Sequence, residues 1–182
     1  MRLVVRVVGA IVVLLVALAL AGLFLPGRYH VSRSVVIAAP PSAIYPNIGD
    51  LKAWPKWGVW FARDPAMQIA YSPTTSAIGA WSAWTSKSQG NGRMTVTAKE
   101  PPNRFDYRLE FPDEGMVASG SVSLVAAGAG STRVTAAMDG ELGRSPFNRW
   151  FGFFMDTIIG PDFQGGLANL KRISEAPARA GS

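Results

Sequence analysis

Cysteine is absent from this chain of 182 residues, and histidine occurs only once, at His30. Without cysteine the chain has neither disulfides nor thiolate metal sites. A zinc site or a Ser-His-Asp triad would need its histidine inside a pocket with fixed partners. His30 instead follows a long apolar segment directly, so we expect an interfacial or loop histidine and no metal site.

Familiar nucleotide-binding and metalloprotease motifs are also absent, because the chain has no P-loop, no GxGxxG and no HExxH pattern. Acidic residues number 12 against 18 basic ones, which gives a net charge of +6. The basic residues are dispersed along predicted strands, whereas nucleic-acid binding depends on clustered positive charge. We therefore expect no nucleic-acid partner and no cofactor, and a positive surface suited to anionic lipid headgroups.

The amino terminus contains the longest apolar run, which extends from Val7 to Leu25 without a charge. About 20 apolar residues are enough to cross the hydrocarbon core of a bilayer as a helix. Arginines flank the run, with Arg2 and Arg6 before it and Arg28 and Arg33 after it. We expect this run to be a transmembrane helix, which would make the chain a single-pass protein of the cell membrane.

A cleaved signal peptide is the alternative, since residues 19–21 have the small-x-small form of a cleavage site. The apolar run continues past that site to Leu25, which favours an uncleaved anchor. The predicted division is an anchor at 1–27, one folded domain at 28–175 and a disordered tail at 176–182. An amino terminus in the cytoplasm and an extracytoplasmic domain is the expected orientation, although the flanking charges are nearly balanced.

The middle of the chain reads as strands, because apolar and polar residues alternate there with the period of two of a half-buried strand. Short connections indicate antiparallel neighbours. Met94, Val96 and Ala98 are predicted to face a core, and Lys99 to face solvent. The predicted strands are 29–38, 67–72, 79–86, 93–100, 104–111, 116–127 and 132–139, and two short helices, at 43–48 and from Asp50 onward, follow the first of them.

The last long apolar segment has the periodicity of an amphipathic helix. Its apolar residues recur at intervals of three and four, at Phe163, Leu167, Leu170 and Ile173. Proline fits the first turn of a helix better than its interior, so Gly160-Pro161 is predicted to divide the segment. We expect a helix from Pro146 to about Thr157, with Ser145 as its N-cap, and a longer helix from Pro161 onward.

This order of elements predicts an α+β fold in which a curved antiparallel sheet wraps around the long C-terminal helix, since the apolar face of the sheet needs a cover. The segments RSVVIAAPPSAIYPNIGDLKAWPKW (33–57) and MDTIIGPDFQGGLANLK (155–171) strengthen this interpretation. They resemble the SRPBCC superfamily of START and Bet v 1-like helix-grip proteins, and within it the polyketide cyclase or dehydrase group, which includes membrane-anchored bacterial members. The resemblance implies a deep cavity for hydrophobic or amphipathic small molecules.

The six tryptophans are a heavy load for a domain of this size. Tryptophan either fills a core or forms the wall of an apolar pocket, and some of these residues could instead lie at a membrane interface. The candidate ligand-binding residues lie on the predicted apolar face of the sheet or on the helix stripe. They are Trp57, Trp60, Trp81, Trp84, Tyr107, Phe111, Met138, Phe163 and Leu167.

Two carboxylates are the weak candidates for catalysis, because Asp156 and Asp162 bracket the predicted helix junction. A carboxylate beside an apolar cavity can have a raised pKa and act as an acid or a base. The simpler interpretation places Asp162 in the first turn of the long helix, where it favours the helix dipole, and leaves Asp156 solvated. We prefer the simpler interpretation.

Three functions are compatible with these observations. The preferred one is a membrane-anchored domain that binds a hydrophobic small molecule or lipid between sheet and helix, without chemistry. A polyketide cyclase or dehydratase-like enzyme using the same cavity is the first alternative. An envelope structural or interaction module whose cavity is filled by its own side chains is the second. The volume of the space under the C-terminal helix distinguishes the last from the other two.

Overall fold

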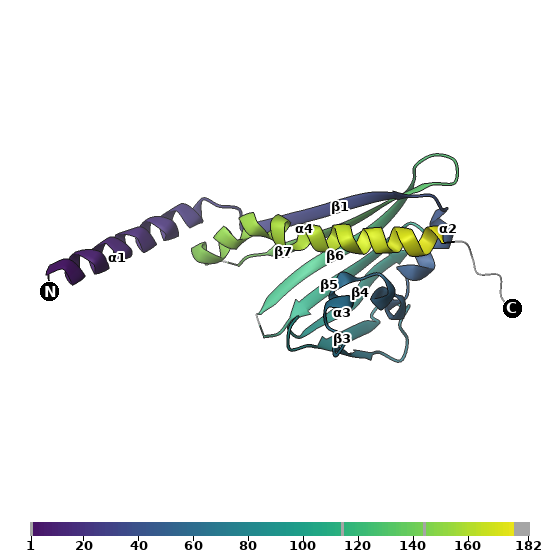
Figure 1. The fold of residues 1–182 in the computed structure, drawn as a ribbon, viewed down its shortest axis with the longest axis horizontal. Coiled ribbons are helices and arrows are strands. Elements are labelled where there is room, and N and C mark those ends of the chain that lie inside the picture. The colour runs from purple at the N-terminus through teal and green to yellow at the C-terminus, as the bar shows by residue number, and fades with distance from the viewer. Residues whose placement is uncertain (1, 114, 144, 177–182) are drawn as a thin grey trace.

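The computed structural model describes residues 2–113, 115–143 and 145–176, so most of the predicted disordered tail lies outside the described residues. Helix α1 (Arg2–Leu23) projects away from the rest of the chain, and only its last turns contact the C-terminal helix (Figure 1). It is long and apolar enough to cross a membrane, and none of its apolar window is buried inside the protein. It is therefore not the core helix of a soluble domain.

The domain that follows contains one seven-stranded antiparallel sheet with the order β1-β7-β6-β5-β4-β3-β2. The sheet is a meander except that the first strand pairs with the last, which places the start of the domain beside its final strand. This confirms the predicted α+β fold. The strands are β1 (Arg28–Ile37), β2 (Gln68–Tyr71), β3 (Trp81–Thr85), β4 (Gly92–Glu100), β5 (Arg104–Phe111), β6 (Met116–Ala126) and β7 (Thr132–Glu141).

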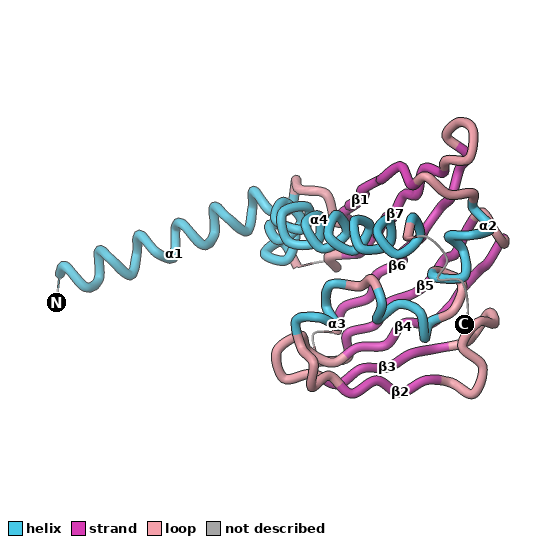
Figure 2. Tube along the Cα trace, turned by 45° about the vertical axis from the view of Figure 1, so that its right-hand side comes forward, coloured by secondary structure: helices cyan, strands magenta, loops and turns pink. Residues whose placement is uncertain are grey.

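Four short helical segments connect β1 to β2, where two were predicted. Prolines recur through this stretch at Pro41, Pro46, Pro55 and Pro65, which disfavours a longer continuous helix. Asp50 begins the third segment as predicted, and its side chain accepts a hydrogen bond of 2.9 Å from the Lys52 amide. The segments are α2 (Pro41–Ile44), η1 (Tyr45–Asn47), η2 (Leu51–Lys56) and α3 (Val59–Arg63), and in Figure 2 they lie beside the C-terminal helix.

Helix α4 (Pro146–Glu175) is a single helix of 30 residues, so the predicted break at Gly160-Pro161 is wrong. An interior proline costs roughly 3 kcal/mol. Packing on both sides of Pro161 outweighs this cost. Met155 and Ile159 before it and Phe163 after it all contact the same core. Ser145 and Pro146 occupy the predicted N-cap and N1 positions, although the Ser145 side chain makes no capping hydrogen bond.

A β-bulge in β4 changes which side chains face the core. The register with β5 shifts between Val96 and Ala98, so Lys99 pairs with Phe105 on the inner face. A bulge inserts one residue and reverses the alternation beyond it. The predicted solvent-facing position of Lys99 is therefore wrong. Its Nζ donates instead to the carbonyl oxygens of Gly49, at 2.9 Å, and of Ser76.

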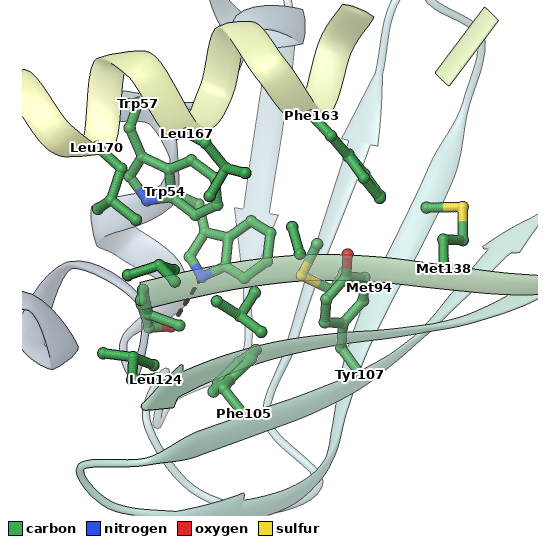
Figure 3. Packing of buried hydrophobic residues seen from close by; sticks show 14 of the residues in the cluster. Trp54, Trp57, Met94, Phe105, Tyr107, Leu124, Met138, Phe163, Leu167 and Leu170 are labelled. Carbon is green, nitrogen blue, oxygen red and sulfur yellow. Dashed lines mark hydrogen bonds between the residues drawn. The ribbon is translucent and has the colours of Figure 1, made fainter. Parts of the chain in front are cut away.

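The core lies between the inner face of the sheet, α4 and η2 (Figure 3). Trp54 is at its centre, and the centroid of its ring system lies 4.7 Å from that of Trp57 and 5.2 Å from the ring of Tyr107. Its indole N–H donates to the Ile48 carbonyl at 2.9 Å, so this buried polar group is satisfied.

Three inner-face glycines lie directly beneath aromatic rings of neighbouring strands. A Cβ added to any of them would lie 2.2 Å from an atom of the covering ring. The missing side chain lets each ring lie flat against the sheet, which suits a sheet that curves around a helix. The pairs are Gly92 under Trp84, Gly120 under Tyr107 and Gly140 under Tyr29.

Candidate functional site

The space beneath the middle of α4 is almost completely filled. Its volume is about 10 Å³, at the lower limit of what holds one water molecule. The deep cavity predicted between sheet and helix is therefore not open in this conformation of the described residues. Trp54 of η2 and Trp57, the residue directly after η2, fill it from one side, and Phe163 fills it from α4. Trp54 had been left out of the predicted lining set, although it belongs to the same Trp-x-x-Trp sequence as Trp57.

Four of the predicted ligand-binding residues, Trp57, Trp60, Tyr107 and Phe163, come together around this small space. Tyr107 lies on the floor of this space with its ring and hydroxyl over Gly120, and burial raises the pKa of this hydroxyl well above its ordinary value. It is thus a neutral hydroxyl at physiological pH. Leu167 and Met138 belong to the same buried core without bordering this space.

The other three predicted lining residues lie elsewhere. Trp84 of β3 and Phe111 of β5 pack against the core away from this small space, and they form an edge-to-face pair with ring centroids 5.9 Å apart. Trp81 lies on the outer face, where the Arg93 guanidinium is 4.5 Å from its ring centroid. Its predicted place on the inner face is wrong, because residues three apart on a strand point to opposite faces and Trp84 points inward.

A larger open space lies at the end of the sheet where β6 and β7 separate. Their ladder ends at the pair Ala118 and Gly140, and beyond it β6 pairs only with β5 and β7 only with β1. The first turns of α4 cover this fork. The result is an open groove of about 1010 Å³. Its apolar lining consists of Met116, Val117, Ala118, Leu142, Phe151 and Met155.

Charged residues line the outer rim of the groove, and the structure pairs them. Arg28 donates to Glu141 at 3.0 Å, and His30 lies 2.8 Å from Asp139. His30 is thus on strand β1 beside a carboxylate and not in a loop. Among the described residues, no group of three histidine, aspartate or glutamate side chains is placed to hold a metal ion.

Sequence reasoning missed this groove, because strand periodicity does not reveal where two paired strands separate. One signal was available in the glycines that end both arms of the fork. Gly115, with φ of 62°, precedes β6, and Gly143, with φ of 68°, follows β7. Glycine is favoured at such left-handed positions, where the chain turns sharply.

The two carboxylate candidates are both ion-paired. Asp156 accepts two hydrogen bonds of 2.8 Å from Arg33, and these bonds hold the pKa of the Asp156 carboxyl below its ordinary value. Gly160 has no side chain, which lets the Arg33 guanidinium lie against α4. The expectation that Asp156 is simply solvated is therefore wrong, because it is paired with Arg33.

Asp162 is 8% exposed and accepts two hydrogen bonds from Arg63 of α3, one of them 3.0 Å long. It lies in the middle of α4, so the expectation that it begins a helix is also wrong. A carboxylate held by both donors of a guanidinium is a structural acceptor, because protonating it would break the pair. The arrangement is better suited to joining α3 to α4 than to proton transfer.

Solved structures with low sequence identity share this fold. A protein from Thermobifida fusca has a TM-score of 0.63 at 17% identity, covering 80% of this chain and 92% of that one. Ara h 8.0201 has a TM-score of 0.55 at 15% identity, covering 83% of this chain and 100% of that one. A norcoclaurine synthase from Thalictrum flavum, with a bound transition-state analogue, has a TM-score of 0.59 at 10% identity, covering 81% and 94%.

These similarities identify the fold as Bet v 1-like, of the SRPBCC type. A comparison with curated proteins found no match to the chain. A family model described as "Polyketide cyclase / dehydrase and lipid transport" matches residues 28–175. The match begins with β1 and ends with α4, so it includes every strand and leaves α1 outside. The chain therefore belongs to the polyketide cyclase / dehydrase and lipid transport family.

Proposed function

We propose that this protein is a membrane-tethered domain that binds a hydrophobic small molecule or lipid in the groove between the β6–β7 fork and α4. The family and the fold support hydrophobic ligand binding in general. The observation that carries the more specific proposal is the groove itself, which has a volume of about 1010 Å³, a lining of both apolar and polar side chains, and a cover formed by the first turns of α4.

The apolar lining of the groove can supply the affinity without catalytic groups. Removing apolar surface from water contributes roughly 25 cal/mol per Å², so burying about 200 Å² of a ligand contributes about 5 kcal/mol. Part of this is offset by the loss of the ligand's freedom of motion. The polar rim residues Arg28, Asp139 and Glu141 would then face a headgroup or solvent.

Contacts between α1 and α4 support an anchor that is retained after synthesis. Arg149 donates to the carbonyl oxygens of Leu23 at 2.8 Å and Leu25 at 3.2 Å, and the Trp150 indole N–H donates to that of Leu18 at 3.0 Å. A backbone atom of Pro146 would lie 2.3 Å from a Cβ at position 22, so Gly22 permits this contact. Cleavage after residue 21 would remove Leu18, the partner of Trp150, and would leave Leu23 and Leu25, the partners of Arg149, on the remaining chain.

The filled space beneath α4 favours an interaction module as the second candidate, because a solid interior needs no ligand. The enzymatic alternative has less support, since Asp156 and Asp162 are both engaged by arginines. Neither carboxylate is available as a free acid or base in this conformation.

Native mass spectrometry of the full chain, released from nanodiscs of phosphatidylethanolamine and phosphatidylglycerol, tests the proposal. The expected result is a retained lipid on the wild-type chain and its loss from Val117→Trp, which places an indole in the groove at a partly exposed position. Val125→Trp is the matched control, because Val125 is on the same strand, 61% exposed and outside the groove. Equal retention by both variants would exclude this groove, and no retention by any of the three chains would favour the interaction module.

A further inference from the structure

We propose that the first half of α4, residues 146–158, is a second membrane element that lies in the bilayer interface beside the last turns of α1. The inference rests on the proposed anchor and goes beyond it, because it assigns a lipid contact to the folded domain itself. It also gives the groove a definite environment, since its mouth would open at the level of the acyl chains.

An exposed apolar stripe runs along this half of α4. Its members are spaced by four, three and four residues, which places them on one face of a helix. Each is between 46% and 58% exposed, while Met155 and Ile159, on a neighbouring face, pack against the core. The helix thus has one apolar face for the protein and a second face without a partner in the described chain. The stripe consists of Phe147, Phe151, Phe154 and Ile158.

The position of α1 identifies the partner of this stripe as lipid. The Trp150 indole donates to the carbonyl of Leu18, which lies inside the uncharged run that ends at Leu25. Leu18 lies five residues before the end of α1 at Leu23, which corresponds to roughly 8 Å along the helix, so Trp150 lies about that far below the end of α1. Both ribbon views place the start of α4 against the end of α1 (Figures 1 and 2). If α1 spans a bilayer, the stripe is at the depth of the headgroup and acyl boundary.

The charges of this helix half are compatible with that depth. Arg149 is directed toward the carbonyls that end α1, and Asp156 is paired with Arg33. Both lie on the side of the helix opposite the stripe, so the lipid-facing side carries no charge. Tryptophan at the interface and close packing at a glycine such as Gly22 are both typical of membrane helices.

The groove is continuous with this helix, because Phe151 belongs to the stripe and also lines the groove. Met155, one turn further, lines it as well. A hydrophobic molecule leaving the bilayer along the stripe could therefore enter the groove without crossing water. The geometry points to a bilayer lipid, or another solute dissolved in the bilayer, as the source of the ligand.

The absence of cysteine makes the proposal directly testable by site-directed spin labelling. Phe147 and Phe154 are each replaced by Cys in the full chain, spin-labelled, and reconstituted in vesicles of phosphatidylethanolamine and phosphatidylglycerol. The depth of each label in the bilayer is measured by the ratio of its collision rate with oxygen to its collision rate with a water-soluble nickel chelate. Val125 is the aqueous control, since it is also an exposed apolar side chain but lies at the far end of β6. Leu14, in the middle of α1, is the lipid control.

The expected ratio at Phe147 and Phe154 is within about twofold of that at Leu14 and roughly tenfold above that at Val125, as for a helix embedded in the interface. A ratio equal to that at Val125, with Leu14 still in lipid, would overturn this inference and leave the anchor intact. A water-accessible Leu14 would overturn both. Two labelled sites are used so that a local disturbance at one of them does not decide the outcome.

Discussion

Replacing Gly120 by alanine is expected to destabilise the domain, because the glycine lies under the ring of Tyr107. The added Cβ would be 2.2 Å from the ring carbon that carries the hydroxyl and 2.5 Å from the hydroxyl oxygen. Ordinary contacts begin near 3.5 Å, so the ring would have to move by more than 1 Å. Trp54, with its centroid 5.2 Å from that of Tyr107, opposes this movement. Overpacking of this kind costs typically about 1–3 kcal/mol, and the rigidity of the ring places the expected loss at the upper end.

The measurement is the free energy of unfolding of the full chain in detergent, obtained from a urea titration followed by near-ultraviolet circular dichroism. Gly27→Ala is the matched control, since its Cβ would meet nothing closer than 3.8 Å, and its expected effect is within about 0.5 kcal/mol. A double-mutant cycle with Tyr107→Ala isolates the clash. Without the ring, Gly120→Ala should cost almost nothing further. Strictly additive losses, or an unchanged stability of the single variant, would refute the reasoning.

Three further predictions concern α4. Arg63→Ala should lower the free energy of unfolding by about 1–2 kcal/mol, because it leaves buried Asp162 unpaired while the arginine itself is half exposed. The pKa of Asp156 is lowered by its hydrogen bonds to Arg33. The stability that this ion pair contributes is therefore present above the unfolded-state pKa of Asp156 and is lost as the pH falls through its folded-state pKa. Arg33→Gln should remove this loss from a plot of unfolding free energy against pH in the acid range. Pro161→Ala restores an N–H for the helix and should raise the thermal unfolding midpoint, and a lowered midpoint would contradict the account of the unbroken helix.

The strands and the antiparallel pairing of successive strands could be predicted from the sequence, because alternation is a local property and the connections are short; the pairing of β1 with β7 has no such local signal. The segment 132–141 alternates without interruption, and the structure buries its even-numbered residues through Gly140. Local alternation fails at a bulge, which depends on the partner strand. Lys99 was misplaced for this reason, since nothing within 93–100 announces the extra residue that the register with β5 reveals.

The course of α4 illustrates a different limit. A proline in an apolar segment predicts a break when the segment is considered alone. The decision depends on whether the residues on both sides of it are bound to the same core, and that is a tertiary property. Met155 and Phe163 are bound to it, and the helix continues through Pro161.

The candidate site was the least predictable part, because it depends on volumes. Aromatic residues on an inner face are compatible with a pocket wall and with a solid core, and the distinction requires the positions of side chains from several elements. Trp57, Trp60, Tyr107 and Phe163 lie around one space, yet Trp54 completes the packing and leaves about 10 Å³. The open groove arises instead where the backbones of β6 and β7 diverge, and this divergence produces no periodic pattern of side chains in the sequence.

The filled interior and the open groove follow from one mismatch of lengths. A helix of 30 residues is about 45 Å long, whereas a strand of 10 residues spans about 33 Å. The C-terminal half of α4 fits over the sheet and, together with η2, fills the concave face. The N-terminal half extends past the end of the β6–β7 ladder, where the sheet offers it only the edge of a fork. That half then needs another partner, and α1 on one side and a bilayer on the other can together provide it. A break at Pro161 would let the two halves reorient separately, so the continuous helix is what ties the position of the groove to that of α1.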